Sequence, residues 1–435
     1  MASGQSSTED DTSGDFFERC GLPRDSWSRC WDLARQIFPN AHIEEAKPQG
    51  YCSYTLCVGS EAIIQFRPEV HKLDLGITTA AQNIYGSLAP QTKLLDVLNI
   101  PKPCPSDEVG ERSHQPPVDE AVVINDGCSK PQVSLYVYSM ARISGISLFE
   151  LRQSSAQSTW PAAEVRRQRG DVVSEFARFI TVGWKSARPA SDSIVSSLRG
   201  RIGGSIRWRL HEMQARLPAR FQPFVGNVLD QLDGIESLPW ALTHGDVIPS
   251  NIMVQNPRGA SSGEVVLSGF LDWAEAEYLP FGLGIYGLEA LLGESDRDGR
   301  FGYYPEAQEL REYFWTRLEA EVPGVRLRSG SEGFRKEVEA AHILGVLLWH
   351  GIAFDNGRLD RVVDESNPDD AEEVRILDLF ISRDEEPRGE HVASAHLLEQ
   401  DRNGSAKFFD VGKVVPDIWA CSGRLNSGDR RMVSS

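Results

Sequence analysis

The chain lacks any long apolar run. None of its stretches approaches the roughly 18 consecutive apolar residues that a membrane-spanning helix needs. Residues 1–15 also lack the basic and apolar regions of a secretory signal peptide. We therefore expect a cytoplasmic protein that has no membrane as a partner.

Paired cysteines and an excess of basic charge are also missing. The seven cysteines are scattered, and no two have the Cys-x2-Cys spacing of a metal site, which favours reduced thiols in a cytosolic protein. The 45 lysines and arginines are outnumbered by 63 aspartates and glutamates, so the formal net charge is −18. A chain this acidic, without a basic stripe, is a poor candidate for binding nucleic acid. It attracts cations such as Mg²⁺ and amines more readily.

The chain is long enough to hold two lobes. Its 435 residues, 40% hydrophobic and 25% charged, have the composition of a globular protein with a large core. Polar sequence without apolar periodicity predicts disorder at residues 1–14 and 386–435. Between them we predict a sheet-rich N-lobe over 15–139 and a helix-rich C-lobe over 140–385. Prolines and scattered charges predict a loop over 101–130.

Local patterns predict the elements of the N-lobe. Apolar residues at helical intervals predict helices over 27–38 and 73–88. Apolar and β-branched runs predict strands over 51–58, 62–66 and 135–140. A small sheet with helices beside it is the expected result.

The C-lobe is predicted to be mainly helical. Helical periodicity without strand signals runs through 147–235, and apolar positions predict a last helix over 374–381. A largely apolar run within 337–352 predicts a buried core helix. It contains His342 and His350, which we interpret as core histidines with partners rather than as ligands.

The most informative stretch begins at His244 and ends just beyond Asp272. Strand-like runs at 252–254 and 265–267 are separated by a turn-rich segment, which predicts an antiparallel hairpin. In such a hairpin the start of the first strand lies beside the end of the second. We therefore expect Asn251 and Asp272 to meet. An amide oxygen and a carboxylate side by side are suitable ligands for Mg²⁺.

Asp246 precedes this hairpin by one loop. It lies five residues before Asn251, the interval found in the catalytic loop of kinases, where the aspartate receives the proton of the substrate hydroxyl and the asparagine binds metal. The sequence His244-Gly245-Asp246, the asparagine and the distal Asp-Trp together resemble the aminoglycoside phosphotransferase family of small-molecule kinases. An ordinary loop and hairpin with surface acids is the alternative interpretation.

This resemblance implies an α+β fold with the two lobes of a protein kinase. It also implies ATP or GTP as co-substrate, Mg²⁺ as cofactor and a small-molecule hydroxyl as acceptor. Asp246 would be the catalytic base, and Asn251 and Asp272 would be the magnesium ligands. Neither the acceptor nor the oligomeric state follows from the sequence.

The resemblance further places the nucleotide against Ser53, Arg67 and Met140. Gly50 and Ser53 lie in a loop where small residues let backbone N–H groups approach phosphate, although a plain β-turn is equally compatible. Arg67 is the available cation for the α- and β-phosphates, and a surface residue before Pro68 is the alternative. Met140 lies in the expected hinge, where it would pack against adenine, or else belongs to a core strand that leaves the sheet.

Three features depart from the family pattern. Gln65 stands where a lysine would have been the easier match for the phosphate-binding cation. The predicted helix contains no glutamate to pair with the cation, which leaves Asp74 or Gln82. Leu283 stands where the family usually has an aspartate that resembles a buttress of the catalytic loop. These departures leave a second class of function open, a catalytically silent relative that retains nucleotide or ligand binding.

Acidic residues follow the motif and are candidates for the acceptor pocket. Glu275, Glu277 and Glu289 would make a pocket that favours a cation. The alternative is a simple acid-rich surface, in keeping with the net charge of −18.

Overall fold

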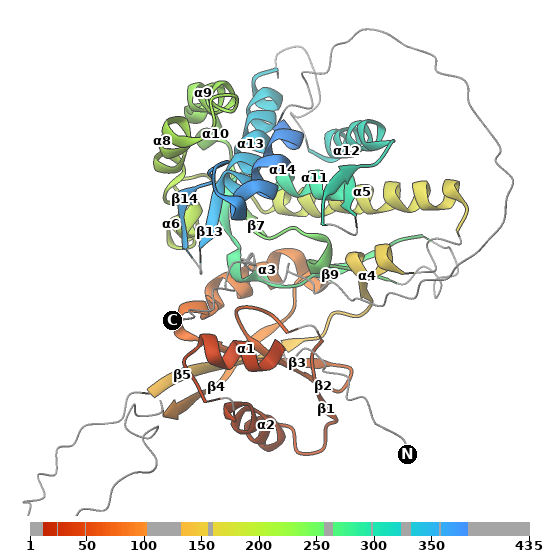
Figure 1. The fold of residues 1–435 in the computed structure, drawn as a ribbon. Coiled ribbons are helices and arrows are strands. Elements are labelled where there is room, and N and C mark those ends of the chain that lie inside the picture. Colours follow the sequence, from red (N-terminus) through yellow and green to blue (C-terminus); the bar gives the residue numbers. More distant parts are fainter. Residues whose placement is uncertain are drawn as a thin grey trace, which may run out of the picture.

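The computed structural model shows a chain folded into two lobes (Figure 1). It describes residues 12–23, 25–47, 49–101, 132–154, 160–255, 264–296, 299–322, 332–355 and 358–381. Most of the predicted loop 101–130, the predicted tail and residues 1–11 therefore lie outside the described residues. The predicted α+β fold with a sheet-rich N-lobe and a helical C-lobe is confirmed by the elements below.

The N-lobe is built on a five-stranded antiparallel sheet. Its strand order is β1-β2-β3-β5-β4, with bounds Ile43–Glu45, Tyr54–Val58, Ala62–Pro68, Gln132–Ala141 and Thr92–Pro101. The edge strand β4 was not expected from the sequence. Side chains alternate across the strands, so that one face of the sheet supplies buried residues such as Leu56, Phe66 and Val137.

Two helices cover this sheet at the start of the chain. Helix α1 (Thr12–Arg19) begins inside the segment expected to be disordered, and α2 (Ser26–Ile37) matches its predicted bounds closely. Phe16 and Phe17 are fully buried against Tyr54 of β2, with ring centroids 6.3 and 4.9 Å away. Burying a large apolar side chain contributes about 1.5–3 kcal/mol, which explains why α1 is held to the sheet.

Helix α3 (Leu75–Tyr85) lies between the two lobes (Figure 1). Short 3-10 turns precede and follow it at Glu69–His71 and Gly86–Leu88. Its buried residues, including Ile77 and Ala81, belong to the core of the C-lobe. The Tyr85 hydroxyl donates to the carbonyl of Leu242, at 2.5 Å. The helix therefore joins the lobe that carries the sheet to the lobe that carries the catalytic motif.

The chain crosses to the C-lobe through a hinge after β5. Gly145 adopts a φ of +117° there, and a Cβ at this position would collide with the carbonyl oxygen of Val254. A residue other than glycine would therefore disturb the crossing. Strand β6 (Ile146–Ser147) follows. It pairs with β8 (Ile252–Val254) in a three-stranded sheet of order β6-β8-β9, in which β9 is Leu267–Phe270.

The C-lobe is helical around one large core. Along α5, buried Val173, Phe176, Ala177 and Ile180 recur at helical spacing, as the apolar periodicity predicted. The helices are α4 (Leu148–Gln153), α5 (Ala162–Lys185), α6 (Ser193–Ser197), α7 (Gly200–Gly203), α8 (Ile206–Arg216), α9 (Gln222–Asp230), α10 (Leu232–Ser237), α11 (Gly287–Leu291), α12 (Ala307–Glu321), α13 (Glu332–His350) and α14 (Ala371–Ile381). None of the helices in the described ranges combines the length and apolar character that crossing a bilayer requires.

Short antiparallel pairs connect these helices. They are β7 (Trp240–Thr243) with β10 (Glu277–Pro280), β8 (Ile252–Val254) with β9 (Leu267–Phe270), β11 (Gly293–Ser295) with β12 (Phe301–Tyr303), and β13 (Ile352–Asp355) with β14 (Arg358–Val362). The pairs β7–β10 and β8–β9 flank the motif from His244 to Asp272 and place it on the face of the C-lobe that lies nearest α3.

Candidate active site

The predicted hairpin forms and brings the two expected metal ligands to the same end. Ile252 pairs with Phe270, and the N–H of Leu271 donates to the carbonyl of Asn251 at 2.8 Å. Asn251 therefore lies beside the residue that precedes Asp272. The second strand starts at Leu267 rather than at residue 265, and most of the turn between the strands lies outside the described residues.

Asp272 has an unusual backbone conformation. Its φ of 54° and ψ of 73° lie in the left-handed region, and among the described residues it is the one non-glycine residue with a positive φ. Aspartate tolerates this region better than most residues. Such conformations persist where the surrounding structure determines them, and they cluster at functional sites. The turn aims a carboxylate at the space between the lobes, where its Oδ1 accepts from Arg67 NH2 at 3.2 Å.

His244 ties the catalytic loop to this turn. Its Nε2 lies 2.7 Å from the carbonyl oxygen of Leu271, and the N–H of Asp246 donates to its Nδ1 at 3.2 Å. A neutral ring that donates from Nε2 satisfies both contacts. Burial lowers the pKa of His244 to about 4, so the ring is neutral at pH 7. Its face packs against Trp273, with ring centroids 4.7 Å apart.

Asp246 is buried and oriented by its neighbours. Nδ2 of Asn251 donates to Asp246 Oδ2 at 2.8 Å and to its carbonyl oxygen at 3.2 Å. Gly245 has a φ of +82°, and a Cβ there would collide with the carbonyl oxygen of Glu275. The glycine of the motif is therefore required by the close approach of two backbone segments.

Tyr286 supports the loop that carries Asp246. The N–H of Val247 donates to the Tyr286 hydroxyl at 2.9 Å, and Tyr286 is buried in the 3-10 turn Leu283–Tyr286. Leu283, where an aspartate buttress would have been expected, is itself buried against the core. The sequence offered no signal for the role of Tyr286. A tyrosine three residues after Leu283 is equally compatible with simple core packing.

Arg67 reaches the same site from the N-lobe. The alternative of a surface residue before Pro68 is wrong, because only 1% of the Arg67 surface is exposed. Its Nε donates to Gln65 Oε1 at 2.9 Å, and its NH2 pairs with Asp272. The two residues weighed as substitutes for the missing glutamate act within α3 instead. Asp74 caps the start of the helix by accepting from the N–H of Gly76 at 2.7 Å, and Gln82 donates to the carbonyl of Gly86.

Ser53 and Met140 lie at the two other expected nucleotide positions. Ser53 is buried in the loop before β2, with its Oγ 3.1 Å from Thr55 Oγ1. Gln49 fixes this loop by donating to the carbonyl of Thr55 and accepting from its N–H, both at 2.8 Å. Met140 is half-buried near the end of β5, next to the hinge.

A cavity opens beside Asp246. Glu275 and Glu277 line it, together with apolar residues from β10, α13, β13 and β14. Glu289 does not line it, which corrects one of the three acidic candidates. That carboxylate is fully buried and held by Arg311 NH2 at 2.8 Å and by the Tyr303 hydroxyl at 2.6 Å.

The two histidines of α13 lie in the core, as interpreted from the sequence, and each has a carboxylate neighbour. Nε2 of His342 lies 3.5 Å from Glu289, and Nδ1 of His350 lies 2.8 Å from Glu373. Both rings are buried. Among the described residues, no group of three His, Cys, Asp or Glu side chains is arranged to hold a metal ion.

Comparisons with known proteins give matches in structure only. No protein-family model matches the chain, and no curated protein matches it in sequence. The GDP complex of aminoglycoside 2'-phosphotransferase-IIIa aligns with 74% of this chain and 90% of its own, at 12% identity and a TM-score of 0.42. Plasmodium vivax ethanolamine kinase aligns with 80% of this chain and 88% of its own, at 9% identity and a TM-score of 0.43.

A third structure is a thermostable mutant of an aminoglycoside phosphotransferase with AMP-PNP and hygromycin B. It aligns with 80% of this chain and 96% of its own, at 14% identity and a TM-score of 0.42. All three are small-molecule phosphotransferases, the kind of protein that the sequence motif resembles. What this chain does is inferred from its own site residues.

Proposed function

We propose that this chain is a small-molecule kinase that transfers the γ-phosphoryl group of ATP or GTP to a hydroxyl group. One observation carries the proposal: Asp246, Asn251 and the turn at Asp272 belong to a single network that runs through the neutral ring of His244. Nothing in ordinary core packing requires a base, an amide and a strained aspartate to converge beside a cavity.

The donor set fits a magnesium ion. Asn251 and Asp272 supply an amide oxygen and a carboxylate, which are hard oxygen ligands of the kind that Mg²⁺ prefers, and the ion usually completes its shell with water and phosphate. Nδ2 of Asn251 is engaged by Asp246, so the amide oxygen is the atom that remains as a ligand. A bound ion would neutralise charge on the β- and γ-phosphates.

The side chains of this chain would then have separate roles in phosphoryl transfer. Asp246 orients the acceptor hydroxyl and receives its proton as the oxygen attacks phosphorus, while the bond from phosphorus to the leaving nucleotide oxygen breaks. Arg67 binds phosphate oxygens through its planar guanidinium. Because the transition state of phosphoryl transfer is loose and highly charged, position and electrostatics account for most of the catalysis.

A catalytically silent binding protein is the second candidate. The observation that favours it is the pairing of Arg67 with Asp272, the proposed metal ligand itself. In addition, α3 supplies no glutamate in the position that kinases use to hold the cation. The intact network around Asp246 favours catalysis.

The test is the variant Asp246→Asn, with Asp233→Asn as a matched control on exposed α10. Asp246→Asn keeps the shape of the side chain, so nucleotide affinity should be unchanged. Turnover with hydroxyl-bearing amines and sugars should fall about 10²–10⁴-fold, the usual contribution of a positioned general base. A variant as fast as the parent would exclude Asp246 as the base. Nucleotide binding without turnover of any acceptor would favour the silent binding protein.

A further inference from the structure

The cavity beside Asp246 has walls of two different kinds, and together they restrict the acceptor. This inference rests on the proposed function, because it takes the cavity to be the acceptor site. One wall is apolar and formed by elements that are distant in sequence. Its side chains are Leu279 of β10, Leu283, Leu348 of α13 and Ile352 of β13. All four are at least nine-tenths buried.

Aromatic packing makes part of this wall rigid. Trp349 lines the cavity and stacks on Tyr286, with ring centroids 4.7 Å apart and an interplanar angle of 19°. Tyr286 is in turn held by the N–H of Val247. A hydroxyl or amide left without a hydrogen-bond partner against such a wall weakens binding. A sugar or aminoglycoside, which carries polar groups on every side, is therefore a poor match.

The second wall is acidic, but only one of its glutamates remains for a ligand. Glu277 already accepts from the N–H of Ile202 at 2.9 Å and from the N–H of Gly203 at 2.6 Å, one bond to each oxygen. Burial raises the pKa of Glu277 to about 7, so its charge is partly lost at neutral pH. Both carboxylate oxygens of Glu277 are thus used to hold helix α7 in place.

Glu275 is the other acid of this wall, and its side chain is exposed at the cavity. Removal of water by the surrounding protein and the charge of Asp272 raise the pKa of Glu275, and the smaller influences of Arg201 and Arg67 oppose them. A positive group placed here would relieve this excess of negative charge. The described residues that line the cavity include no basic side chain.

We propose that the acceptor is an amphipathic amino alcohol: a hydrocarbon or aromatic body lies against Leu348 and Trp349, a single amino group pairs with Glu275, and the hydroxyl reaches Asp246. Charge and polarity both enter this assignment. The cavity excludes polycations because it offers one available carboxylate besides the base, and it favours an apolar body because most of its surface is apolar.

Calorimetry with the full chain and Mg²⁺–ADP tests this with four probes. L-phenylalaninol has an aromatic body, one amine and one hydroxyl; 3-phenylpropan-1-ol lacks the amine, ethanolamine lacks the aromatic body, and kanamycin is a polycation. Phenylalaninol should bind about tenfold to a hundredfold more tightly than ethanolamine, as expected for burial of an aromatic ring. Equal or tighter binding of kanamycin or ethanolamine, or no binding of phenylalaninol, would overturn the proposal.

The variant Glu275→Gln tests whether Glu275 is the residue that pairs with the amino group of the acceptor. The preference for phenylalaninol over 3-phenylpropan-1-ol should disappear in this variant and should persist in Glu309→Gln, an exposed control on α12. A preference that survives Glu275→Gln would contradict the role of Glu275. Phosphoryl transfer measured on the same probes separates the two proposals: phenylalaninol that binds without being phosphorylated contradicts the proposed kinase function alone, and preferred transfer to kanamycin contradicts the acceptor class alone.

Discussion

Arg67 and Asp272 form the contact at which the two lobes meet inside the site. Removing a guanidinium from water is costly, and the cost is offset only where good partners are supplied. Arg67 has such partners in Gln65 and Asp272, which lies 205 positions further along the chain. The pair therefore holds β3 beside the turn at Asp272 and places a cation where the proposed function expects phosphate.

Arg67→Ala should weaken nucleotide binding about tenfold to a hundredfold, because a hydrogen bond to a charged group contributes about 1.5–3 kcal/mol. Gln65→Ala is the matched control, since it removes a neutral partner of the same side chain and should cost far less. Titration of ATP by calorimetry measures both, and circular dichroism checks that the variants are folded. A larger loss in Gln65→Ala than in Arg67→Ala would show that Gln65 is the phosphate contact.

His244 makes the stability of the site depend on pH. Burial lowers its pKa in the folded chain to about 4, from 6.5 in the unfolded chain. Below pH 6.5 the unfolded chain takes up a proton that the folded chain does not. The stabilising contribution of the neutral ring is therefore complete above pH 6.5 and is lost as the pH falls toward 4.

Urea unfolding between pH 7.5 and about pH 4.5 should show the parent losing up to about 1.4 kcal/mol per pH unit relative to His244→Gln. The comparison with the variant is essential because Glu277 acts with the opposite sign. Its raised pKa, about 7 against 4.5 in the unfolded chain, gives a contribution that is complete below pH 4.5 and is lost as the pH rises through 7. A difference between parent and variant that does not change with pH would show that folding does not lower the pKa of His244.

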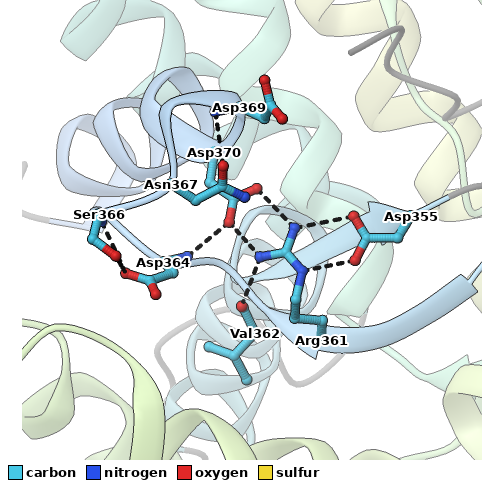
Figure 2. A network of polar contacts seen from close by, with 8 residues as sticks. All are labelled: Asp355, Arg361, Val362, Asp364, Ser366, Asn367, Asp369 and Asp370. Carbon is cyan, nitrogen blue, oxygen red and sulfur yellow. Dashed lines mark hydrogen bonds and ion pairs between the residues drawn. The ribbon is translucent and has the colours of Figure 1, made fainter. Parts of the chain in front are cut away.

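At the scale of elements, the hairpin β13–β14 depends on one arginine. Figure 2 shows Arg361 between Asp355 and Asp370, with its Nε 2.7 Å from Asp355 Oδ2 and its NH2 3.0 Å from Asp370 Oδ1. Asp370 immediately precedes α14, so the arginine fastens the hairpin to that helix. Ile352 and Leu359 of the hairpin line the cavity beside Asp246, the proposed acceptor site. Arg361 is therefore a positioning residue for the cavity wall.

Arg361→Met should raise the KM for the acceptor about fivefold to tenfold, as expected for a loss of roughly 1 kcal/mol of binding, and should leave nucleotide affinity unchanged. Arg220→Met is the control, because Arg220 also pairs with two acids, Glu365 and Asp378, but at an exposed position where ion pairs contribute little. Steady-state kinetics with both substrates distinguishes the two variants. An equal change in the KM for nucleotide would point to general loosening of the C-lobe.

At the scale of the whole molecule, α3 and the Arg67–Asp272 pair are two of the connections between the N-lobe and the C-lobe. The Tyr85 hydroxyl reaches the strand that leads into the motif, and Arg67 reaches the turn that follows it. A nucleotide bound between the lobes would contact both the N-lobe and the C-lobe. Ligand binding and stability of the complete chain should therefore be coupled.

Mg²⁺–ATP or Mg²⁺–GTP should raise the Tm, with a stabilisation of about 2.7 kcal/mol at a hundredfold excess over the Kd. The shift should depend on magnesium in the parent and much less in Asp272→Asn, because that variant lacks the charged metal ligand. Thermal unfolding with and without EDTA measures both effects. No shift with either nucleotide would count against the kinase proposal, and an unchanged magnesium dependence in Asp272→Asn would exclude Asp272 as a ligand.

The sequence by itself determined the features that depend on near neighbours. Helical spacing of apolar residues placed α2, α3 and α14 within a few residues, and two apolar runs around a turn placed the hairpin that carries Asn251 and Asp272. Periodicity and turn chemistry are local properties of the backbone, so they can be read without knowing the fold. The spacing from Asp246 to Asn251 is local in the same sense.

Only the tertiary structure decided which distant residues become partners. The edge strand β4 pairs with β5 across a long intervening segment, Arg67 finds Asp272, and Tyr286 supports the catalytic loop. Of the acidic residues after the motif, Glu275 and Glu277 line the cavity, whereas Glu289 is buried in an ion pair with Arg311. The physical reason is that burial and ion pairing depend on what packs against a side chain, and a local pattern does not contain those neighbours.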